Sequence, residues 1–441
     1  MQVVYTCVAG LDVHKRTVVA TRMQVTQEQQ LDWETQTFGT TTPELLALHD
    51  WLQAWSVSHV AMESTGEYWK PVYNLLTEDF AVWVVNAQHV SHVPGRKTDV
   101  GDAQWLAELM LYGLLKPSFI PPAPQQALRD LTRYRISVIQ ERTRVVNRVQ
   151  KLLEAANIKL ASVVSDVQGV SARAMLAELA QGNTDAEAMA ELARGRLRHK
   201  LPELERALTG RVQAHQRFLL STQLAHIDFL DEQLVQLEEQ IAQQLTTMSQ
   251  PPAPPDGVDE GPGTPEPDSA SPSPDWHAAV ALLDTVPGIN PRTAEVILAE
   301  IGLDMRRFPT AGHLARWAGV APGNHQSGGK RYSGRTTQGN RFLKTTLVQC
   351  AHAAARTKGS FLSARYHRLA GRRGKKRALM AVAHSMLVAI WHMLTTGEVF
   401  HDLGSDYYDH RSHDRKLAYY RRQLEQLLGA PVQISLDSVL T

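Results

Sequence analysis

The 441-residue sequence is poor in cysteine, with only Cys7 and Cys350. Two cysteines so far apart in the chain argue against a disulfide framework and against a zinc site built on cysteine, and they fit a reducing cytoplasm. The sequence also lacks an apolar run close to the roughly 20 residues that a membrane-spanning helix needs. Its first residues do not have the charged start and small-residue cleavage site of a signal peptide. We therefore expect a cytoplasmic protein without a membrane partner.

Acidic residues are missing from residues 305–380, which hold 17 Lys and Arg and no Asp or Glu. Residues 1–120 have the opposite bias, with 7 basic and 13 acidic residues. A stretch of this length with many basic residues and no acidic residue is not typical of a solvated surface, where both signs of charge are mixed. It indicates a surface that binds a polyanion. The acidic half needs a different explanation, and clustered carboxylates that hold cations are one.

The length and the pattern of the chain predict several regions. Residues 248–275 are rich in Pro, Gly, Ser and acidic residues, and cannot bury enough apolar surface to fold. Heptad-spaced apolar residues predict two long helices, over 125–160 and 216–247, which either pair with each other, pair between chains, or pack on their own domain. We predict five regions: an α/β domain over 1–120, a helical coiled-coil region over 121–247, a linker over 248–275, a mainly α domain over 276–400, and a tail over 401–441.

The N-terminal pattern predicts the order strand, strand, strand, helix, strand, helix, strand, helix. Apolar and β-branched segments indicate strands at 3–13, 16–25, 35–38, 59–62 and 81–85. A capping-box pattern at 64–67 predicts the start of one helix, and another helix is expected from about 99 to 113. This order favours a mixed sheet with flanking helices.

Four acidic residues stand where the predicted strands and helices begin or end. Asp12 lies in an apolar strand, Glu63 closes another, and Asp99 and Asp102 open a helix with i, i+3 spacing. Converging carboxylates suit a pair of Mg²⁺ ions, which can activate a nucleophile and stabilise the leaving oxygen in phosphoryl transfer. Each acid also has a structural alternative, as a turn or helix cap or, for Glu63, as the acceptor of a loop hydrogen bond.

The Gly- and Lys-rich loop at 319–339 is a second candidate site. Its glycines allow the backbone to approach a phosphate closely, and four basic residues could hold the phosphate oxygens: Lys330, Arg331, Arg335 and Arg341. A serine attacks phosphorus when a base takes its proton, but no carboxylate lies nearby in the sequence. From the residues alone, Ser327 and Ser333 are equal candidates, and a phosphate-binding loop with a passive serine is the alternative.

Basic residues elsewhere predict further contacts with nucleic acid. Arg142, Arg144 and Arg148 lie on the helix expected over 125–160, and Lys344 follows the loop. Binding through such residues should weaken steeply as salt rises. Residues 283–290 precede a helix in a pattern like a helix-hairpin-helix turn, although an ordinary loop explains them equally well.

Several short strings resemble the DEDD transposases of bacterial insertion sequences, in particular the subgroup that acts as bridge-RNA-guided recombinases. In the N-terminal part they are GLDVHK at 10–15, MESTG at 62–66 and KTDVGDA at 97–103. In the C-terminal part, the family's transposase domain is matched by Pro322, Ser327-Gly328, Lys330-Arg331 and Gly339-Asn340-Arg341. The resemblance covers residues 1–115 and 280–395, and the linker at 248–275 is longer than the family pattern requires.

This resemblance implies a ribonuclease H/RuvC-like fold whose Asp12, Glu63, Asp99 and Asp102 hold two Mg²⁺ ions, or Mn²⁺ in their place. It implies that Ser327 attacks the scissile phosphate, forms a phosphoserine intermediate, and meets the carboxylates in a composite site. The implied partners are donor DNA, target DNA and a guide (bridge) RNA. The heptads and the exchange of strands indicate a homodimer or a homotetramer.

Two other functions fit the sequence. A RuvC-like, metal-dependent junction-resolving nuclease would use water as its nucleophile, so Ser327→Ala would leave cleavage intact. A non-catalytic scaffold for nucleic acid would keep every activity after Asp12→Asn.

Overall fold

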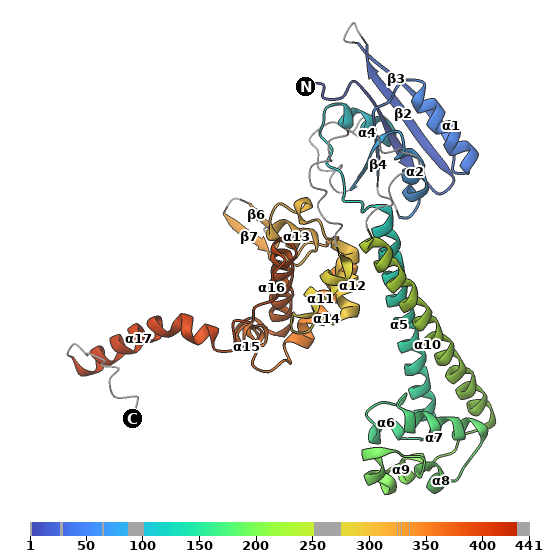
Figure 1. Cartoon of the computed structure of the whole chain (residues 1–441), viewed down its shortest axis with the longest axis vertical. Coiled ribbons are helices and arrows are strands. Elements are labelled where there is room, and N and C mark those ends of the chain that lie inside the picture. Colours follow the sequence, from blue (N-terminus) through green and yellow to red (C-terminus); the bar gives the residue numbers. More distant parts are fainter. Residues whose placement is uncertain are drawn as a thin grey trace, which may run out of the picture. The chain divides into compact units, whose positions relative to one another are not determined.

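In the computed structural model, the described residues are 2–26, 30–63, 66–86, 101–250, 275–323, 325–327, 329–334 and 336–429. The chain divides into two compact units, Met1–Pro121 and Pro122–Thr441 (Figure 1). The first unit contains the sheet and the second is almost entirely helical.

The first unit is built on a five-stranded mixed sheet in the order β3-β2-β1-β4-β5. The strands are β1 (Cys7–Val13), β2 (Thr17–Val25), β3 (Leu31–Gly39), β4 (His59–Glu63) and β5 (Ala81–Val85). The first three strands are antiparallel, whereas β4 runs parallel to both β1 and β5. The predicted mixed sheet with flanking helices is confirmed.

Helices cover both faces of this sheet because its inner strands alternate between two apolar cores. Ala9, Leu11 and Val13 of β1 pack with α1 (Thr42–Gln53) and α2 (Trp69–Leu76). Val8 belongs to the other core, which contains the buried residues of α4 (Asp102–Leu111). Successive side chains of a strand point to opposite faces, so a strand buried on both faces reads as one apolar run.

Three elements of this unit differ from the sequence prediction. β3 has nine residues rather than four, because it pairs along the whole of β2 although most of its residues are exposed. The first strand begins at Cys7, because the backbone N–H groups of Val4 and Tyr5 donate to the Leu111 carbonyl instead of to a strand. The helix predicted to begin at 64–67 begins instead at Trp69, as α2, and Ser64 of the predicted capping box lies outside the described residues.

The second unit begins with two long helices, α5 (Ala123–Ala155) and α10 (Ala214–Ser249), which lie side by side (Figure 1). Their shared core includes Val145 and Val149 of α5 and Leu220 and Ile227 of α10, so the two apolar stripes meet within one chain. A tip of short helices joins them: α6 (Leu160–Val163), α7 (Val170–Gln181), α8 (Ala186–Ala190), η1 (Gly195–Lys200) and α9 (Leu201–Leu208).

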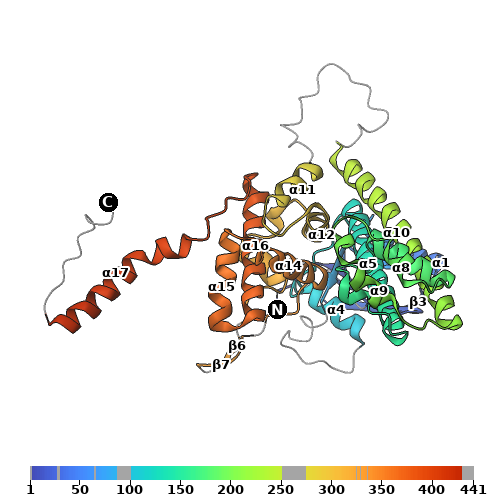
Figure 2. The same ribbon diagram turned by 90° about the horizontal axis from the view of Figure 1, so that it is seen from below.

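The C-terminal part of this unit is a cluster of helices with one small hairpin, β6 (His325–Ser327) and β7 (Lys330–Ser333). Its core combines most of these helices with one end of the long pair, because Leu128 and Ile241 belong to the same cluster. The helices are α11 (Trp276–Asp284), α12 (Pro291–Ile301), η2 (Met305–Arg307), α13 (Ala311–Trp317), α14 (Arg341–Ala354), α15 (Phe361–Arg373), α16 (Lys375–Thr396) and α17 (Tyr407–Leu428) (Figure 2).

Helix α16 is both long and apolar. An 18-residue window of it has a mean hydropathy of 1.6, so by length and composition alone it is apolar enough to cross a membrane. The sequence analysis predicted that no apolar run approaches the length of a membrane-spanning helix, and α16 does not fit that prediction. The side chains of Val382, Met386 and Ile390 are nevertheless fully buried in the core of the second unit, which accounts for this composition.

The two ends of the predicted linker are held close to each other. The backbone N–H of Trp276, at the start of α11, donates to Ser249 Oγ, at the end of α10, over 3.1 Å. Thr246 Oγ1 and His277 Nε2 also share a hydrogen bond of 3.1 Å. Residues 251–274 lie outside the described chain, but α10 and α11 are joined directly on either side of them.

Candidate carboxylate site and serine hairpin

Asp12 and Glu63 lie at the same edge of the sheet. Leu11 pairs with Met62 across the parallel strands β1 and β4, so the next residues, Asp12 and Glu63, are neighbours at the carboxyl ends of both strands. Alternation places both side chains on the face that α4 covers, because Val8 and Ala61 lie on that face at even spacing from them. The pairing of these two acids on one face follows from the register alone.

The start of α4 is held close to this edge by Gly10. A Cβ added to Gly10 would lie 2.1 Å from the Ala103 carbonyl oxygen and 2.4 Å from the Ala107 nitrogen. Only a residue without a side chain allows α4 to pack this closely on β1. Since Asp102 precedes Ala103 and Gly10 lies two residues from Asp12, this contact brings the first turn of α4 toward the acidic edge.

The carboxylates do not form a complete metal centre within the described chain. No group of three or more His, Cys, Asp or Glu that could hold a metal ion occurs among the described residues. Asp99 lies outside the described residues, so the predicted set is described only in part. Asp12, whose side chain is 25% exposed, shares a 3.0 Å hydrogen bond with His14 Nε2. Asp102 lies in the first turn of α4, where its charge also favours the helix dipole.

The hairpin β6–β7 distinguishes the two candidate serines. Ser327 pairs with Lys330 next to the turn, whereas Ser333 pairs with His325 at the other end of the ladder. Gly329 in the turn has a positive φ of +75°, and an added Cβ would meet nothing within 4 Å. Ser327 is therefore beside the open turn and opposite an exposed lysine. The side chains of Ser327 and Arg331, and all of Arg335, lie outside the described part of the chain.

One close backbone approach and two hydrogen bonds of Lys344 hold the base of this hairpin together. A Cβ added to Gly339 would lie 2.3 Å from the Gly319 nitrogen, and both glycines have positive φ angles. Lys344 Nζ donates to Thr336 Oγ1 over 2.9 Å and to the Thr337 carbonyl over 3.3 Å. Lys344, which the sequence assigns to nucleic-acid binding, thus already holds the hairpin base in this structure.

The glycine of the helix-hairpin-helix-like turn has a packing role. Gly288 has a φ of +90°, and a Cβ there would lie 2.4 Å from the Cys350 carbonyl oxygen and 2.5 Å from the Ala354 nitrogen. The turn therefore packs on α14 at this point. This contact favours the alternative that the turn is an ordinary connection between α11 and α12.

The three arginines predicted to bind nucleic acid on α5 differ in their surroundings. Arg142 donates from Nε to Asp231 Oδ1 over 2.5 Å and from Nη2 to Asp231 Oδ2 over 3.0 Å, which ties α5 to α10. These contacts with the aspartate raise the pKa of Arg142 above its usual value. Arg144 and Arg148 are exposed and one helical turn apart. Of the three arginines, Arg144 and Arg148 are therefore the ones whose charge is available to a phosphate.

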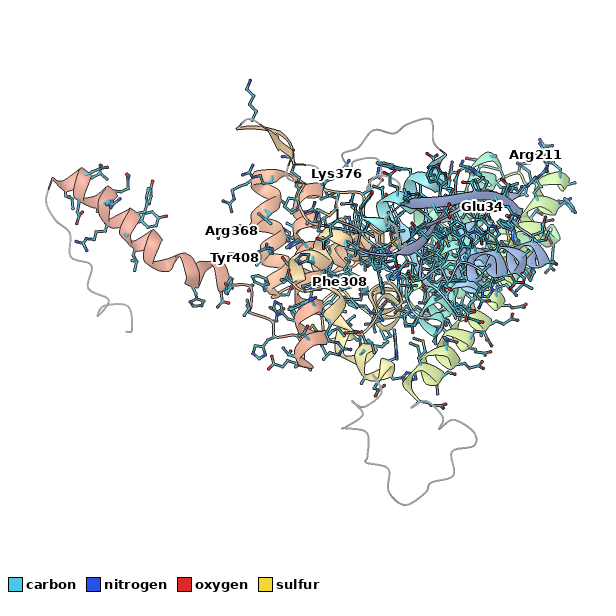
Figure 3. The ribbon with its side chains drawn as sticks, turned by 90° about the horizontal axis from the view of Figure 1, so that it is seen from above. Glu34, Arg211, Phe308, Arg368, Lys376 and Tyr408 are labelled. Carbon is cyan, nitrogen blue, oxygen red and sulfur yellow. The ribbon has the colours of Figure 1, made fainter. Side chains whose placement is uncertain are left out.

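An exposed basic corner joins α15 to α16. Five cations surround Gly374, and all of them are exposed: Arg372, Arg373, Lys375, Lys376 and Arg377. Figure 3 labels Lys376 in this corner and Arg368 further back on α15. The first turn of α16 has no acidic residue and no side-chain cap, so its backbone N–H groups and its lysines carry the same sign of charge.

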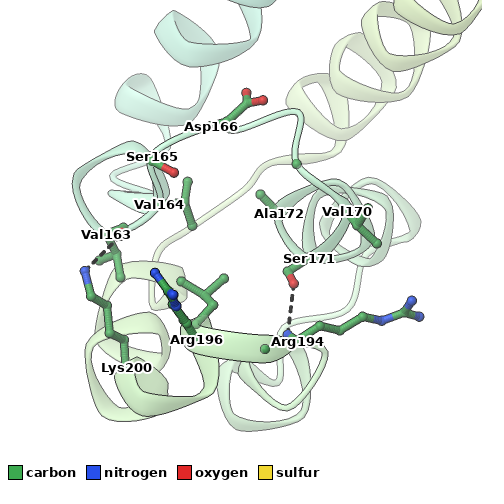
Figure 4. A pocket seen from close by; sticks show the side chains of 13 residues that line it. Val163, Val164, Ser165, Asp166, Val170, Ser171, Ala172, Arg194, Arg196 and Lys200 are labelled. Carbon is green, nitrogen blue, oxygen red and sulfur yellow. Dashed lines mark hydrogen bonds between the residues drawn. The ribbon is translucent and has the colours of Figure 1, made fainter. Parts of the chain in front are cut away.

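A cavity of about 550 Å³ lies in the tip of the second unit, between α6, the start of α7 and η1 (Figure 4). Its walls include Val164, Ala172 and Leu197, and Lys200 Nζ donates to the Val163 carbonyl over 3.4 Å at its edge. None of the predicted catalytic residues lines it. This cavity is therefore separate from both candidate sites.

Sequence reasoning missed a polar cluster around the buried side chain of Glu300. Its partners are Arg129 and Arg133 on α5 and Asn340 at the end of the hairpin loop. More than 160 residues separate Glu300 from either arginine, and no local pattern connects them. The one available signal was an acidic residue inside the apolar run of α12.

Comparison with known proteins places both candidate sites in one family. Residues 9–158 match a model of DEDD transposases of IS110 elements, described as "Transposase", and residues 280–367 match the "Transposase IS116/IS110/IS902 family". The chain is 33% identical over 127 residues to the insertion element IS110 uncharacterized 43.6 kDa protein of Streptomyces coelicolor, covering 28% of this chain and 31% of that protein.

Two further relatives have related names. The chain is 32% identical over 122 residues to the transposase for insertion sequence element IS1111A of Coxiella burnetii, covering 27% of this chain and 33% of the relative. It is 45% identical over 56 residues to the pilin gene-inverting protein of Moraxella bovis, covering 13% of this chain and 17% of the relative. The alignments thus span about a third or less of each of these relatives. Since one family match contains Asp12 and Glu63 and the other contains Ser327, the chain belongs to the IS110/IS116/IS902 family of DEDD transposases.

Proposed function

We propose that this chain is the transposase of an insertion sequence and cleaves and exchanges DNA strands. The observation that carries the proposal is the register of β1 and β4, which makes Asp12 and Glu63 neighbours on the face under α4. The family matches cover this edge and, separately, the serine hairpin. The strand order, with three antiparallel strands followed by two parallel ones, supports a ribonuclease H/RuvC-like fold for the first unit.

Asp12, Glu63, Asp99 and Asp102 would hold two divalent ions, Mg²⁺ or Mn²⁺. Carboxylate oxygens at adjacent strand ends are the donors that such hard ions prefer, and the partly exposed Asp12 is accessible to them. When bound, a pair of ions would polarise the scissile phosphate and stabilise the leaving oxygen. The hydrogen bond between Asp12 Oδ2 and His14 Nε2 is compatible with this role, because a carboxylate that holds a metal ion is commonly hydrogen-bonded by a second residue.

Ser327 would be the nucleophile. Its Oγ would attack phosphorus, forming an Oγ–P bond while the bond from phosphorus to one deoxyribose oxygen breaks. The serine proton passes to a base, and the departing deoxyribose oxygen gains a proton. A hydroxyl group of a second strand then attacks the phosphoserine, which joins the strands and restores the serine. The place of Ser327 beside an open turn and opposite Lys330 supports this role over one for Ser333.

The nucleic-acid surface would include the basic corner of α15 and α16, Arg341, and Arg144 and Arg148 on α5. Cations in the first turn of a helix oppose its dipole, so Lys375 and Lys376 stand where they reduce stability unless an anion is present. A phosphate backbone would supply that anion. We include donor and target DNA and a guide RNA among the partners, a homodimer or homotetramer as the assembly, and the cytoplasm as the location.

The decisive experiment compares Ser327→Ala with Ser333→Ala. The probe is a plasmid that carries the complete insertion element encoding this chain, and the readout is DNA covalently attached to the protein after denaturation. We expect Ser327→Ala to abolish both the adduct and recombination, and Ser333→Ala to keep both. Cleavage that persists in Ser327→Ala without an adduct would favour the junction-resolving nuclease with water as nucleophile.

A further inference from the structure

We propose that Glu300 is a positioning residue that fixes the base of the serine hairpin to α5 through Asn340. This inference rests on the proposed role of Ser327. It concerns a partly buried group of side chains around the fully buried Glu300, defined here as the Glu300 cluster, which consists of Arg129, Arg133, Glu300 and Asn340. All four belong to the second unit of the chain.

Two arginines of α5 hold the Glu300 carboxylate, whose side chain is 0% exposed. Arg133 donates from Nε to Oε1 over 2.7 Å and from Nη2 to Oε2 over 2.9 Å, in the two-pronged geometry that fixes a carboxylate most firmly. Arg129 lies 3.3 Å from Oε2 and also donates to the Glu300 carbonyl over 2.6 Å. The end of α12 is thus attached to one short stretch of α5.

The third partner is Asn340, whose side chain has two separate tasks. Its Nδ2 donates to Glu300 Oε2 over 2.6 Å, and its Oδ1 accepts from the Leu343 backbone N–H over 3.0 Å as the N-cap of α14. Asn340 directly follows Gly339, which closes the hairpin base against Gly319. A displacement of Glu300 would therefore be passed on to the segment that carries Ser327.

A second contact reinforces this connection. The guanidinium of Arg133 lies 4.5 Å from the ring centre of Phe342, in the first turn of α14. The same arginine thus contacts the carboxylate that holds Asn340 and the aromatic ring two residues beyond it. A polar cluster of this kind is directional, so it specifies one placement of α14 on α5 more strictly than apolar packing of equal size would.

A selective test removes the donor of Asn340 and leaves its cap of α14 in place, with the added carboxylate beside the cations of Arg129 and Arg133. Asn340→Asp does this: it keeps the acceptor that caps α14 and removes only the donor to Glu300. We expect the variant to fold while the hairpin loses its fixed position.

A matched control exists in the same interface. Arg135 Nη1 donates to Glu295 Oε2 over 2.6 Å, which forms another ion pair between α5 and α12. Arg135 also donates to the Arg292 carbonyl over 3.1 Å, but neither contact involves the hairpin loop or Asn340. Glu295→Gln therefore weakens the joint between α5 and α12 without touching the hairpin.

The experiment measures the covalent DNA adduct in the full-length protein, with the element-bearing plasmid as probe, together with nucleic-acid affinity and thermal unfolding. Asn340→Asp is expected to lower the rate of adduct formation about 100-fold, the size of effect that a displacement near 1 Å produces. Its affinity for nucleic acid and its unfolding temperature should stay close to those of the unchanged chain. Glu295→Gln should keep the adduct rate.

In the double variant Glu300→Gln with Asn340→Asp, the new amide can donate to the new carboxylate, but only its oxygen can accept from Arg133, so one of the two Arg133 hydrogen bonds is given up. We expect it to recover part of the rate that Asn340→Asp loses. An unchanged adduct rate in Asn340→Asp would overturn the inference, and so would an equal loss in Glu295→Gln. A Ser327→Ala protein that still forms the adduct would instead refute the proposed nucleophile, whatever the other variants do.

Discussion

Gly10 of β1 lies so close to Ala103 of α4 that a Cβ at position 10 would be 2.1 Å from the Ala103 carbonyl oxygen. Gly10→Ala should therefore push α4 away from the sheet, because backbone atoms cannot yield as a flexible side chain can. We expect a loss of about 1–3 kcal/mol in the free energy of unfolding of the first unit, together with a loss of DNA cleavage. Thermal unfolding and the adduct assay measure the two effects.

Gly39→Ala is the control for this substitution. The three atoms nearest to a Cβ at Gly39 belong to the end of the Glu44 side chain, with Oε2 at 1.9 Å. This flexible side chain can rotate away, although it then loses its exposed hydrogen bond from Thr41 Oγ1. Gly39→Ala should leave both stability and cleavage almost unchanged. Equal losses in the two variants would show that the sheet tolerates no added methyl group anywhere, and the special role of the Gly10 contact would be wrong.

Replacing Arg142 by alanine should lower stability, whereas replacing Arg148 by alanine should weaken DNA binding. Arg142→Ala removes a two-pronged pair with Asp231 that is partly exposed, so stability should fall by no more than about 1 kcal/mol. Arg148→Ala should leave stability unchanged but reduce the slope of log affinity against log salt by about 1, as expected for one lost phosphate contact. Titrations of duplex DNA at several KCl concentrations would separate them, and a reduced slope in Arg142→Ala alone would contradict this assignment.

The basic corner should show a conflict between stability and binding. Replacing Lys375 and Lys376 by alanine removes cations that oppose the dipole of α16, so the unfolding temperature should rise slightly at low salt. The same change should weaken binding to nucleic acid and lower its salt slope. Alanine at Arg421 and Arg422 of α17 provides a control with the same loss of charge. If the two double substitutions change the unfolding temperature and the binding affinity equally, the basic corner is not a specific binding surface.

His49 should make the first unit more stable below neutral pH. Burial opposes its protonation, but hydrogen bonds and charges of Asp79 and Asp50 outweigh burial and raise the pKa of His49. Its Nε2 lies 2.8 Å from Asp79 Oδ2. Because the folded pKa is above the unfolded value of about 6.5, the stabilisation is complete below that value and disappears as pH rises through the folded pKa.

The measurement for His49 is the free energy of unfolding of the unchanged chain and of His49→Gln between about pH 5.5 and 8. The difference between them should be largest at the acidic end, at no more than about 1 kcal/mol, and should shrink toward pH 8. A difference that grows with pH would have the wrong sign for this ion pair.

The buried strands of the sheet were predictable because a strand buried on both faces is an apolar run in the sequence. β1, β2, β4 and β5 are apolar runs, and the same runs contain Asp12 and precede Glu63. β3 was underestimated, since its outer residues are exposed and its length depends on pairing with β2. The order of the strands was enough to predict that Asp12 and Glu63 lie near each other. That both side chains lie on the same face of the sheet follows only from the register of β1 and β4.

The C-terminal site was less accessible to sequence reasoning. Nothing in the residues distinguishes Ser327 from Ser333, because the difference arises from the position of the turn in the hairpin. Arg142 looked equivalent to Arg144 and Arg148 until its partner on α10 was known. The Glu300 cluster depends on contacts across more than 160 residues, which composition and periodicity do not encode.

The hydrogen bond from the Trp276 N–H to Ser249 Oγ means that the chain leaves α10 and re-enters α11 at almost the same point. Segments inserted between two such anchored points change the loop-closure entropy only slowly with their length. The Pro-rich segment between them could therefore vary in length without disturbing either helix. For the same reason, an affinity tag or fluorescent domain inserted there should leave recombination intact.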